Sequence, residues 1–405
     1  MKGLLRTPDF RRLWLADALS QVGDRVDFLA IPLLATTTLA ASVVQVSLLR
    51  TLSTLPYLLL GLQAGAWCDR MRHRPVLITA DLGRALLIGS IPVAALFGVL
   101  TLGQLFTVVL ITGTLTVFFN VAHQTYLPHL VDRATLPEAN ARLQTNMSVA
   151  AVAGPGAGGL LVQFAGNAGA MAVDALTYLW SALWLRRIRI PDAVPEPTDP
   201  NLRREITEGL RTVLRQPILR AITLHGAVSS LFQSMYMAVS VVFLSRDLHL
   251  PPSVIGLLST VSLVGALVAG AVARRIGARF GAARALCLAA GMYGGSFLLC
   301  AFTTAGWGLI WFVACGIGSS FGIILLNVYT VSFRQAVTPQ PLLGRVTSVA
   351  QTALFGAAPL GSLLGGVIAE VTNTRMTLYV CGFGILASSA ILFASPLRRM
   401  RDLPG

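Results

Sequence analysis

Residues 105–122 read LFTVVLITGTLTVFFNVA, a run of eighteen positions without a single charged side chain. Such a run nearly matches the roughly 20 apolar residues with which an α-helix crosses a bilayer. Because lipid offers the backbone no hydrogen-bond partner, a segment of this length must satisfy its own N–H and C=O groups as a helix. Similar runs recur along the chain, so the sequence predicts an all-α integral membrane protein.

The composition supports the same fold class and excludes others. The chain has 405 residues, of which 55% are hydrophobic and 12% charged, and its mean hydropathy is +0.72. Soluble domains carry about 25% charged residues, so a water-soluble enzyme and a disordered chain are both excluded. The sequence has no P-loop, no nucleophile–base arrangement and no CxxC spacing. We therefore expect no enzyme activity, no cofactor and no metal site.

The apolar runs predict twelve transmembrane helices. A transmembrane β-barrel is excluded because it needs short alternating segments of about ten residues. The predicted spans are 12–39, 43–68, 75–100, 104–126, 141–165, 168–189, 218–245, 252–274, 281–303, 306–333, 345–370 and 375–397.

Charge placement predicts the orientation of these helices. With twelve spans, 26 of the 31 basic residues fall at the two ends of the chain and in the loops on the same side, whereas only Arg246 and Arg375 fall on the other. The positive-inside rule then places both termini in the cytoplasm of a multi-pass cell membrane protein. The net charge of +14 is thereby explained by the lipid bilayer, and no nucleic-acid partner is expected.

One long polar segment, 190–217, divides the chain into two halves. Its first part is rich in proline, and from Asn201 an apolar spacing typical of an amphipathic helix begins. We expect this helix to lie on the inner membrane surface with its arginines on the polar face. The predicted domains are therefore 1–189, the linker 190–217 and 218–405.

The two halves resemble each other as repeats. The turn GAWCDRMRHR at 65–74 matches GAVARRIGAR at 270–279, and Pro155 matches Pro359 at nearly the same offset. Parallel repeats of this kind predict two pseudo-symmetric six-helix bundles around a central cavity.

Three stretches give the chain a resemblance to the major facilitator superfamily of secondary transporters. The turn after the second span carries that family's G-x-x-x-D-R-x-x-x-R pattern, with Arg72 where the family usually has glycine; its residues are Gly65, Asp69, Arg70 and Arg74. The fifth span carries a motif typical of antiporters, formed by Gly154, Pro155, Gly158 and Gly159. The third stretch, FRRLWLADALSQVGDRV with LPHLVDRATLPEANARLQ, is similar to the branch of enterobactin exporters and macrolide-efflux proteins.

The resemblance implies the major facilitator fold and secondary active transport by alternating access. It implies proton-coupled export of an amphiphilic small molecule such as a drug, a macrolide or a siderophore, and we expect a monomer. Two alternatives stay open, an importer of the same fold and a non-transporting membrane scaffold or sensor.

The resemblance also implies a cytoplasmic gate. The acid at the position of Asp69 approaches the start of the eleventh helix, near Gly344 to Val346, where the helix dipole and free N–H groups stabilise a carboxylate. In the fifth span, Gly154, Gly158 and Gly159 allow another helix to approach closely, while Pro155 is expected to kink the helix.

Charged residues inside spans give the strongest site prediction, since they are costly in lipid and usually face a cavity or a partner. Asp24 and Asp27 are neighbours on the first helix, and two like charges this close favour binding of a proton by one of them. We expect Asp27 to pair with Arg50 and Asp24 to exchange protons, with Asp174 as a further candidate and Arg25 paired with another helix. Asp17 fits an interfacial position, and Asp81 is expected to pair with Arg84.

Polar and aromatic side chains in other spans are candidates for the cavity lining. These candidates are Gln21, Tyr57, Asn120, Phe232, Gln233, Tyr236 and Asn327.

The charge distribution generates a topology prediction. A reporter that is active only inside the cell should be active when fused after Gly405, since the predicted helices bring the C-terminus back to the arginine-rich side. Activity confined to an externally active reporter at the same position would contradict the twelve-span topology.

Overall fold

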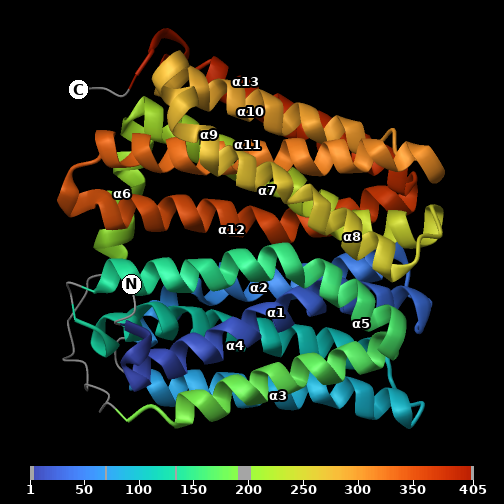
Figure 1. The fold of residues 1–405 in the computed structure, drawn as a ribbon. Coiled ribbons are helices and arrows are strands. Elements are labelled where there is room, and N and C mark those ends of the chain that lie inside the picture. The colour runs from blue at the N-terminus through green and yellow to red at the C-terminus, as the bar shows by residue number, and fades with distance from the viewer. Residues whose placement is uncertain (1–3, 69–70, 133–134, 190–201, 403–405) are drawn as a thin grey trace. The chain divides into compact units, whose positions relative to one another are not determined.

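A computed structural model describes residues 4–68, 71–132, 135–189 and 202–402. Over these residues the chain is helical and contains no β-strand. Figure 1 labels its thirteen α-helices. They are α1 (Pro8–Thr37), α2 (Val43–Cys68), α3 (His73–Leu96), α4 (Leu102–Leu130), α5 (Leu136–Arg186), α6 (Leu202–Arg215), α7 (Pro217–Val242), α8 (Pro252–Ser262), α9 (Val264–Phe280), α10 (Ala282–Cys300), α11 (Leu309–Val337), α12 (Gln340–Val371) and α13 (Thr374–Phe393).

The predicted all-α membrane fold is confirmed. Ten segments in the described part of the chain are long and apolar enough to cross a membrane. The 30-residue α1 is absent from that set and carries several charged residues, among them Asp17, Asp24 and Asp27. The 51-residue α5 counts once although it contains two predicted spans. Each of the twelve predicted spans therefore has a helical counterpart.

Helix α5 is divided by a glycine rather than by its proline. Gly166 has φ 71° and ψ 172°, a conformation that residues with a Cβ avoid, and it separates a first arm, 136–165, from a second arm, 167–186. The predicted spans 141–165 and 168–189 meet at this point. The helix continues through Pro155, where a kink was expected.

Two helix boundaries differ from the prediction. The eighth predicted span is interrupted, because α8 ends at Ser262 and α9 begins at Val264. The eleventh span begins at Gln340, five residues before the predicted start, with Pro339 at its N-cap. The start of α12 consequently lies before Arg345; Pro341 has no N–H group, and the N–H of Leu342 donates to the carbonyl oxygen of Pro339 at 2.9 Å.

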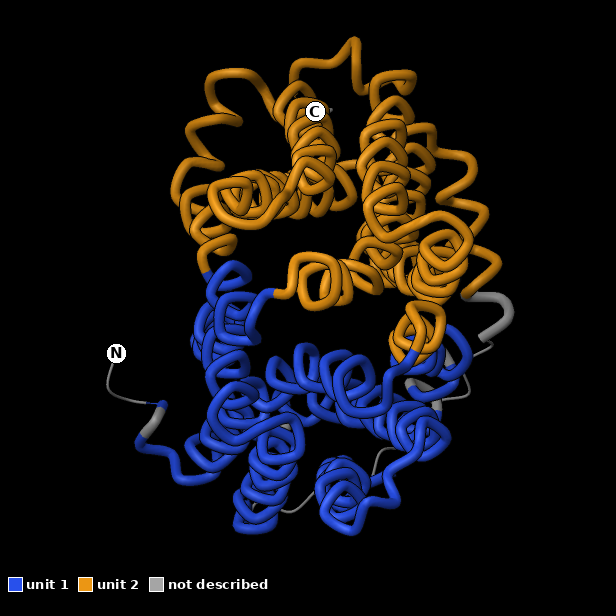
Figure 2. The backbone as a smooth tube through the Cα atoms, turned by 90° about the vertical axis from the view of Figure 1, so that its right-hand side faces the viewer, with its two compact units in different colours: residues 1–41, 52–198, 250–260 blue, residues 42–51, 199–249, 261–405 orange. Residues whose placement is uncertain are grey.

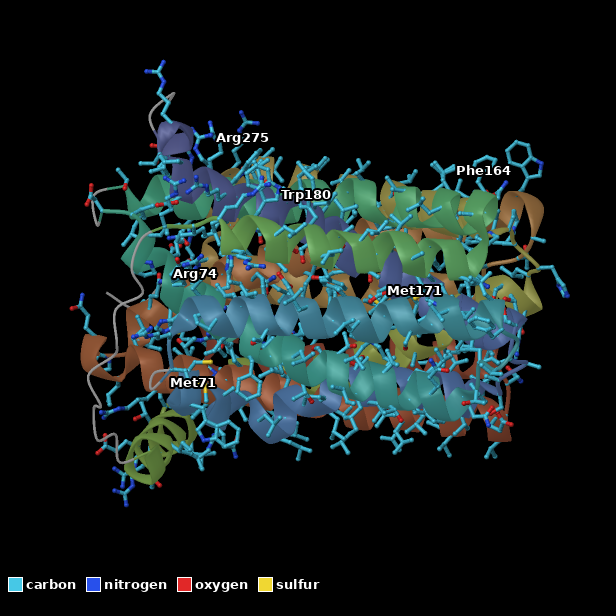
Figure 3. All side chains as sticks on the ribbon, turned by 90° about the horizontal axis from the view of Figure 1, so that it is seen from below. Met71, Arg74, Phe164, Met171, Trp180 and Arg275 are labelled. Atoms are coloured by element: carbon cyan, nitrogen blue, oxygen red, sulfur yellow. The ribbon has the colours of Figure 1, made fainter. Side chains whose placement is uncertain are left out.

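Compact unit 1 comprises residues 1–41, 52–198 and 250–260 (Figure 2). Within it α1 packs along α5, and α3 packs against both α4 and α5. A buried apolar cluster that includes Phe10, Leu77, Tyr126 and Leu185 joins these four helices. Figure 3 shows Met71 and Arg74 at one end of this unit and Phe164 at the other, so its long helices lead from one end to the other.

Compact unit 2 comprises residues 42–51, 199–249 and 261–405. Within it α7 packs against α12 and α13, and α10 packs against α11 and α13. The π-helical turn Phe243–Asp247 extends α7, and Asp247 accepts a hydrogen bond from Thr374 at the start of α13.

The predicted amphipathic helix is present as α6, and it is anchored within unit 2. Glu208 forms an ion pair with Arg345 of α12, and Val213 packs against Val346. Gly209 allows this close approach, since a Cβ there would lie 2.8 Å from the carbonyl oxygen of Arg345. The start of α12 is therefore held by α6.

Glycines set the helix spacing in unit 2, and this generates a stability prediction. A Cβ at Gly361 of α12 would lie 1.9 Å from the backbone carbonyl oxygen of Leu231 in α7, whereas a Cβ at Gly295 of α10 meets nothing within 4 Å. Gly361→Ala should therefore push α7 and α12 apart and lower stability by about 1–3 kcal/mol.

Thermal unfolding of the purified protein measures this effect. Gly295→Ala is the matched control, and it should keep or slightly raise the unfolding temperature because alanine favours helix by about 1 kcal/mol. Equal unfolding temperatures for the two variants would contradict the packing argument.

Candidate functional site

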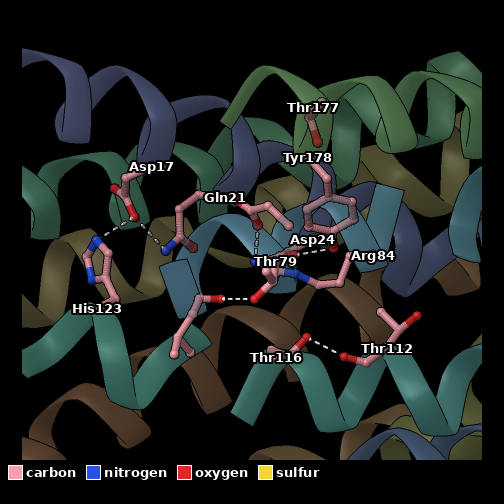
Figure 4. A network of polar contacts seen from close by, with 12 residues as sticks. Asp17, Gln21, Asp24, Thr79, Arg84, Thr112, Thr116, His123, Thr177 and Tyr178 are labelled. Atoms are coloured by element: carbon pink, nitrogen blue, oxygen red, sulfur yellow. Dashed lines mark hydrogen bonds and ion pairs between the residues drawn. The ribbon is translucent and has the colours of Figure 1, made fainter. Parts of the chain in front are cut away.

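A stripe of polar side chains follows one face of α1 in unit 1. Asp17, Gln21 and Asp24 recur at helical spacing, and Figure 4 shows them facing side chains of α4 and α5. Gln21 donates to Asp17 at 3.3 Å, and the hydroxyl of Tyr178 donates to Asp24 Oδ1 at 2.6 Å. The stripe therefore finds its hydrogen-bond partners within the protein, as buried polar groups must.

Asp27 meets Asp174 of α5. Their carboxyl groups interact directly, and the side chain of Asp174 is fully buried. Asp27 Oδ1 and Asp174 Oδ2 are buried without a hydrogen-bond donor. Two carboxylates in contact cannot both be ionised at low cost, whereas one shared proton supplies the missing donor. The arrangement can therefore hold a proton between α1 and α5.

A glycine makes this meeting possible. A Cβ at Gly23 of α1 would lie 2.1 Å from Asp174 Oδ1 and 2.2 Å from the hydroxyl of Thr177. Thr177 in turn donates to Asp174, at 2.8 Å to its carbonyl oxygen and at 3.3 Å to Oδ1. The missing side chain at Gly23 leaves the space that the carboxyl group of Asp174 occupies.

Arg84 is the buried cation of the site. It forms the predicted ion pair with Asp81, and its side chain is only 1% exposed. Its guanidinium carbon also lies 4.2 Å from the ring centroid of Phe119 and 4.5 Å from that of Tyr178. Because Tyr178 binds Asp24, Arg84 is more than the local partner of Asp81: it links α3 to the carboxylates of α1 (Figure 4).

Asp17 lies in a second part of the network. Asn146 of α5 donates to Asp17 Oδ2 at 2.9 Å, and His123 Nε2 of α4 lies 4.0 Å from Oδ1. Asp17 is only 6% exposed, so it lies buried between helices, and its depth in the membrane stays a prediction. Neither Asn146 nor His123 was predicted. Each stands beside other polar residues, Thr145 before Asn146 and Gln124 after His123, so nothing in the sequence singles it out.

The two arginines predicted as charge partners, Arg50 and Arg25, differ in what the structure shows of them. Arg50 belongs to segment 42–51, which is grouped with unit 2, so its pairing with Asp27 stays a prediction. The aliphatic part of the Arg25 side chain packs on Gly154 of α5. A Cβ added at Gly154 would lie only 2.4 Å from the Cβ of Arg25. Arg25 thus packs against another helix, whereas its predicted charge pairing stays a prediction: the structure records no ion pair for it among the described residues.

The predicted gate is described only in part. Asp69 and Arg70 lie outside the described residues, and Gly65 is the fourth residue from the end of α2. Arg74 donates from Nε to the carbonyl oxygen of Leu185 at 3.2 Å and from Nη2 to that of Arg186. Arg74 therefore caps the end of α5, where free carbonyl groups attract a cation.

The glycines of the antiporter-type motif lie in close helix contacts, as predicted. Gly158 faces the backbone of Val26 in α1, since a Cβ at Gly158 would lie 3.3 Å from the Cα of Val26. Gly159 faces α8, since a Cβ at Gly159 would lie 2.5 Å from the carbonyl oxygen of Pro252. Pro155 contributes to the same contact, since its carbonyl oxygen would lie 2.3 Å from a Cβ on Gly256. The motif packs α5 between α1 and the first residues of α8.

The candidate lining residues of unit 1 form local pairs. Asn120 donates to the hydroxyl of Tyr57 at 2.7 Å, which joins α4 to α2. Gln21 is bound to Asp17, as described above.

In unit 2 the candidates divide by exposure. Tyr236 is 8% exposed, lies edge-on against Phe297 and belongs to the interior, and Phe232 fits against Gly384. Gln233 is partly exposed and Asn327 exposed. His225 lies 3.1 Å from the carbonyl oxygen of Ser388, as expected for an interior histidine. The described residues contain no cluster suited to a metal ion.

Comparison with known families identifies the class of protein to which this geometry belongs. A family model described as "transmembrane secretion effector" matches residues 3–403, nearly the whole chain.

Two relatives of the chain are named as efflux proteins. The chain is 29% identical over 377 residues to the multidrug efflux pump Tap of Mycolicibacterium fortuitum, covering 89% of this chain and 90% of that protein. It is 24% identical over 368 residues to macrolide efflux protein A of Streptococcus pyogenes, covering 89% of each.

Solved structures share the fold. A bacterial homologue of the iron transporter ferroportin aligns with a TM-score of 0.79 at 17% identity, covering 97% of this chain and 99% of that one. The nucleoside transporter NupG aligns with a TM-score of 0.77 at 12% identity, covering 95% and 98%. At these identities the likeness establishes the fold alone.

The role of Gly23 generates a prediction about the carboxyl pair. Gly23→Ala should lower the unfolding temperature, because Asp174 and Thr177 would have to leave buried positions to make room for the new methyl group. Gly89→Ala is the control, since a Cβ there lies an ordinary 3.6 Å from Cβ of Ala175. Equal unfolding temperatures for the two variants would contradict a tight contact at Gly23.

Proposed function

Because the chain belongs to the transmembrane secretion effector family within the major facilitator superfamily, we propose that it is a proton-coupled exporter of an amphiphilic small molecule. The names of its relatives, a multidrug efflux pump and a macrolide efflux protein, support a drug-like or macrolide-like substrate. A siderophore is a further candidate of the same amphiphilic class. Transport by a chain without a P-loop would draw on an ion gradient rather than on ATP.

The observation that carries this proposal is the contact between Asp27 and Asp174. In the proposed cycle the pair holds one proton when it is shielded from water and releases it when the site opens. Releasing that proton leaves two adjacent negative charges, which a cationic or polar substrate group would stabilise. Proton and substrate would thus compete for the same carboxylates, which is the basis of exchange in opposite directions.

The proposed role of Asp24 differs from the proton exchange that was predicted from the sequence. Its carboxylate accepts the hydroxyl of Tyr178, and the guanidinium of Arg84 lies over the same ring. The contact with Tyr178 gives Asp24 a hydrogen-bond donor, which Asp27 Oδ1 and Asp174 Oδ2 lack. We therefore assign proton exchange to Asp27 and Asp174 and a positioning role to Asp24.

Alternating access would involve the two proposed halves, residues 1–189 and 218–405, joined by 190–217. In the proposed gate, the carboxylate of Asp69 would be stabilised by the helix dipole at the start of α12. Arg70 would brace the loop, and Arg74 would hold that loop to the end of α5. The glycine contacts of α5 would be the surfaces that slide during this change. We propose that a monomer in the cell membrane carries out the whole cycle, with both termini in the cytoplasm.

Two other functions are compatible with the fold. An importer would use the same carboxyl pair in the opposite direction, and the efflux names of the relatives favour export over it. The efflux names likewise favour export over a non-transporting scaffold or sensor, and a scaffold would have no use for the buried oxygens Asp27 Oδ1 and Asp174 Oδ2, which lack a donor. Accumulation of a dye and a macrolide in a deletion strain, with and without an uncoupler, separates these functions: an exporter lowers accumulation only while the proton gradient persists.

The carboxyl pair generates a prediction about coupling. Addition of a transported compound to purified protein in weakly buffered detergent solution should release protons, because the substrate displaces the shared proton. Asp27→Asn and Asp174→Asn should each abolish this release, since an amide cannot give up a proton in this range. A pH-sensitive dye in the same solution measures it.

Glu370→Gln provides the matched control, because Glu370 is an exposed acid outside the site. This variant should release protons as the unchanged protein does. Full release from both Asp27→Asn and Asp174→Asn, with substrate still bound, would overturn the assignment of the pair.

A further inference from the structure

An arginine pocket lies at one end of unit 1, away from the carboxyl network. It is an open hollow of about 510 Å³ lined by Arg12, Arg74, Arg186, Arg187, Ile188 and Arg189. These residues come from the first turns of α1 and α3 and from the end of α5 with the residues that follow it. Five of the six lining side chains are therefore guanidinium groups.

Two arginines of this pocket have no ion pair among the described residues. Arg12 is paired with Asp9 at 2.5 Å, and the same Asp9 oxygen accepts the backbone N–H of Arg189 at 3.1 Å. Arg74 donates to backbone carbonyl groups of α5. Arg187 lies 5.2 Å from the ring centroid of Trp184, a contact that holds the cation without neutralising it. The side chains of Arg186 and Arg189 are exposed and have no ion pair in the described part of the chain.

A phosphate group fits this pocket chemically. The planar guanidinium binds phosphate oxygens through two parallel hydrogen bonds, and several guanidinium groups can share one phosphate. An anion bound here would also relieve the repulsion among the arginines.

The surface next to the pocket favours a lipid over a soluble phosphate. Leu176, Leu179 and Leu183 form an exposed apolar stripe on the second arm of α5, which leads toward Arg186 and Arg187. Trp180, 41% exposed, and Trp184 follow Leu179 and Leu183 on the same arm of α5, with ring centroids 5.6 Å apart. Tryptophan at this position is typical of the boundary between acyl chains and headgroups.

We propose that the arginine pocket binds the phosphate of an anionic phospholipid, whose acyl chains lie along the leucine stripe of α5. On the predicted topology this end faces the cytoplasm, where anionic lipids attract basic segments next to the membrane. The lipid would join α1, α3 and the end of α5 through one headgroup. The site is separate from the proposed transport of a small molecule.

The test uses the full-length protein in uncharged detergent and a fluorescent phosphatidylglycerol as the probe. Unlabelled phosphatidylglycerol, phosphatidylcholine with the same acyl chains and inorganic phosphate serve as competitors. Phosphatidylglycerol should compete much better than the other two, because it alone combines an anionic headgroup with acyl chains.

The double variant R186Q/R189Q should bind the probe about 25-fold more weakly, from about fivefold for each guanidinium near a membrane surface. The control R398Q/R399Q removes two exposed arginines outside the pocket and should change the affinity less than twofold. Size-exclusion profiles verify folding, and R186E/R189E gives a second, charge-reversed measurement at the same positions.

Three outcomes would overturn the proposal. An equal loss of lipid affinity in R186Q/R189Q and R398Q/R399Q would mean that lipid binding depends on the overall charge of the protein and not on the pocket. Equal competition by phosphatidylcholine would remove the need for an anionic headgroup. Competition by inorganic phosphate at the concentrations at which phosphatidylglycerol competes would assign the pocket to a soluble anion. Transport is not measured, so failure of this test leaves the proposed function unaffected.

Discussion

A polar group in the interior of a bilayer has no water to bind, and the arrangement of unit 1 follows from this constraint. Every acid of α1 within the span faces another helix: Asp17 meets Asn146, Asp24 meets Tyr178, and Asp27 meets Asp174. The first two contacts bring a donor to a carboxylate, whereas the third brings two acceptors together. Thr177 donates to one oxygen of Asp174, but Asp27 Oδ1 and Asp174 Oδ2 are left without a donor, which is costly for buried groups. On the proposed function, a shared proton would complete the hydrogen bonding there.

Small residues make these contacts possible. Without Gly23, the carboxyl group of Asp174 could not reach α1, and without Gly154 and Gly158 the first arm of α5 could not lie against Arg25 and Val26. In lipid, helices gain little from burying apolar surface, so close packing and interhelical hydrogen bonds supply the attraction. The same glycines therefore serve packing and site geometry at once, and a substitution at one of them affects both.

The sequence predicted the helices well, because the constraint that produces them is local. An apolar run must be helical in lipid wherever it occurs, and the predicted and observed bounds of α2 coincide at residues 43–68. The break in α5 at Gly166 agrees with the predicted spans 141–165 and 168–189, whereas the helix continues through Pro155, where a kink was expected. Arg84 was predicted only as the partner of Asp81, and its contact with the ring of Tyr178 was missed. Tyr178 and His123 were missed altogether: they come from two different helices, and nothing in their spacing brings them to the acids of α1. Only the helix packing does so.

The buried carboxylates of the described residues lie in unit 1. Within the spans of unit 2 the described residues include no buried carboxylate, and the buried polar groups there include His225, which contacts Ser229 and Ser388. The hydroxyl groups of Ser229 and Ser388 lie 2.8 Å apart and satisfy each other without a charge. On the proposed proton coupling, the described carboxylates that could exchange a proton within the membrane therefore belong to unit 1.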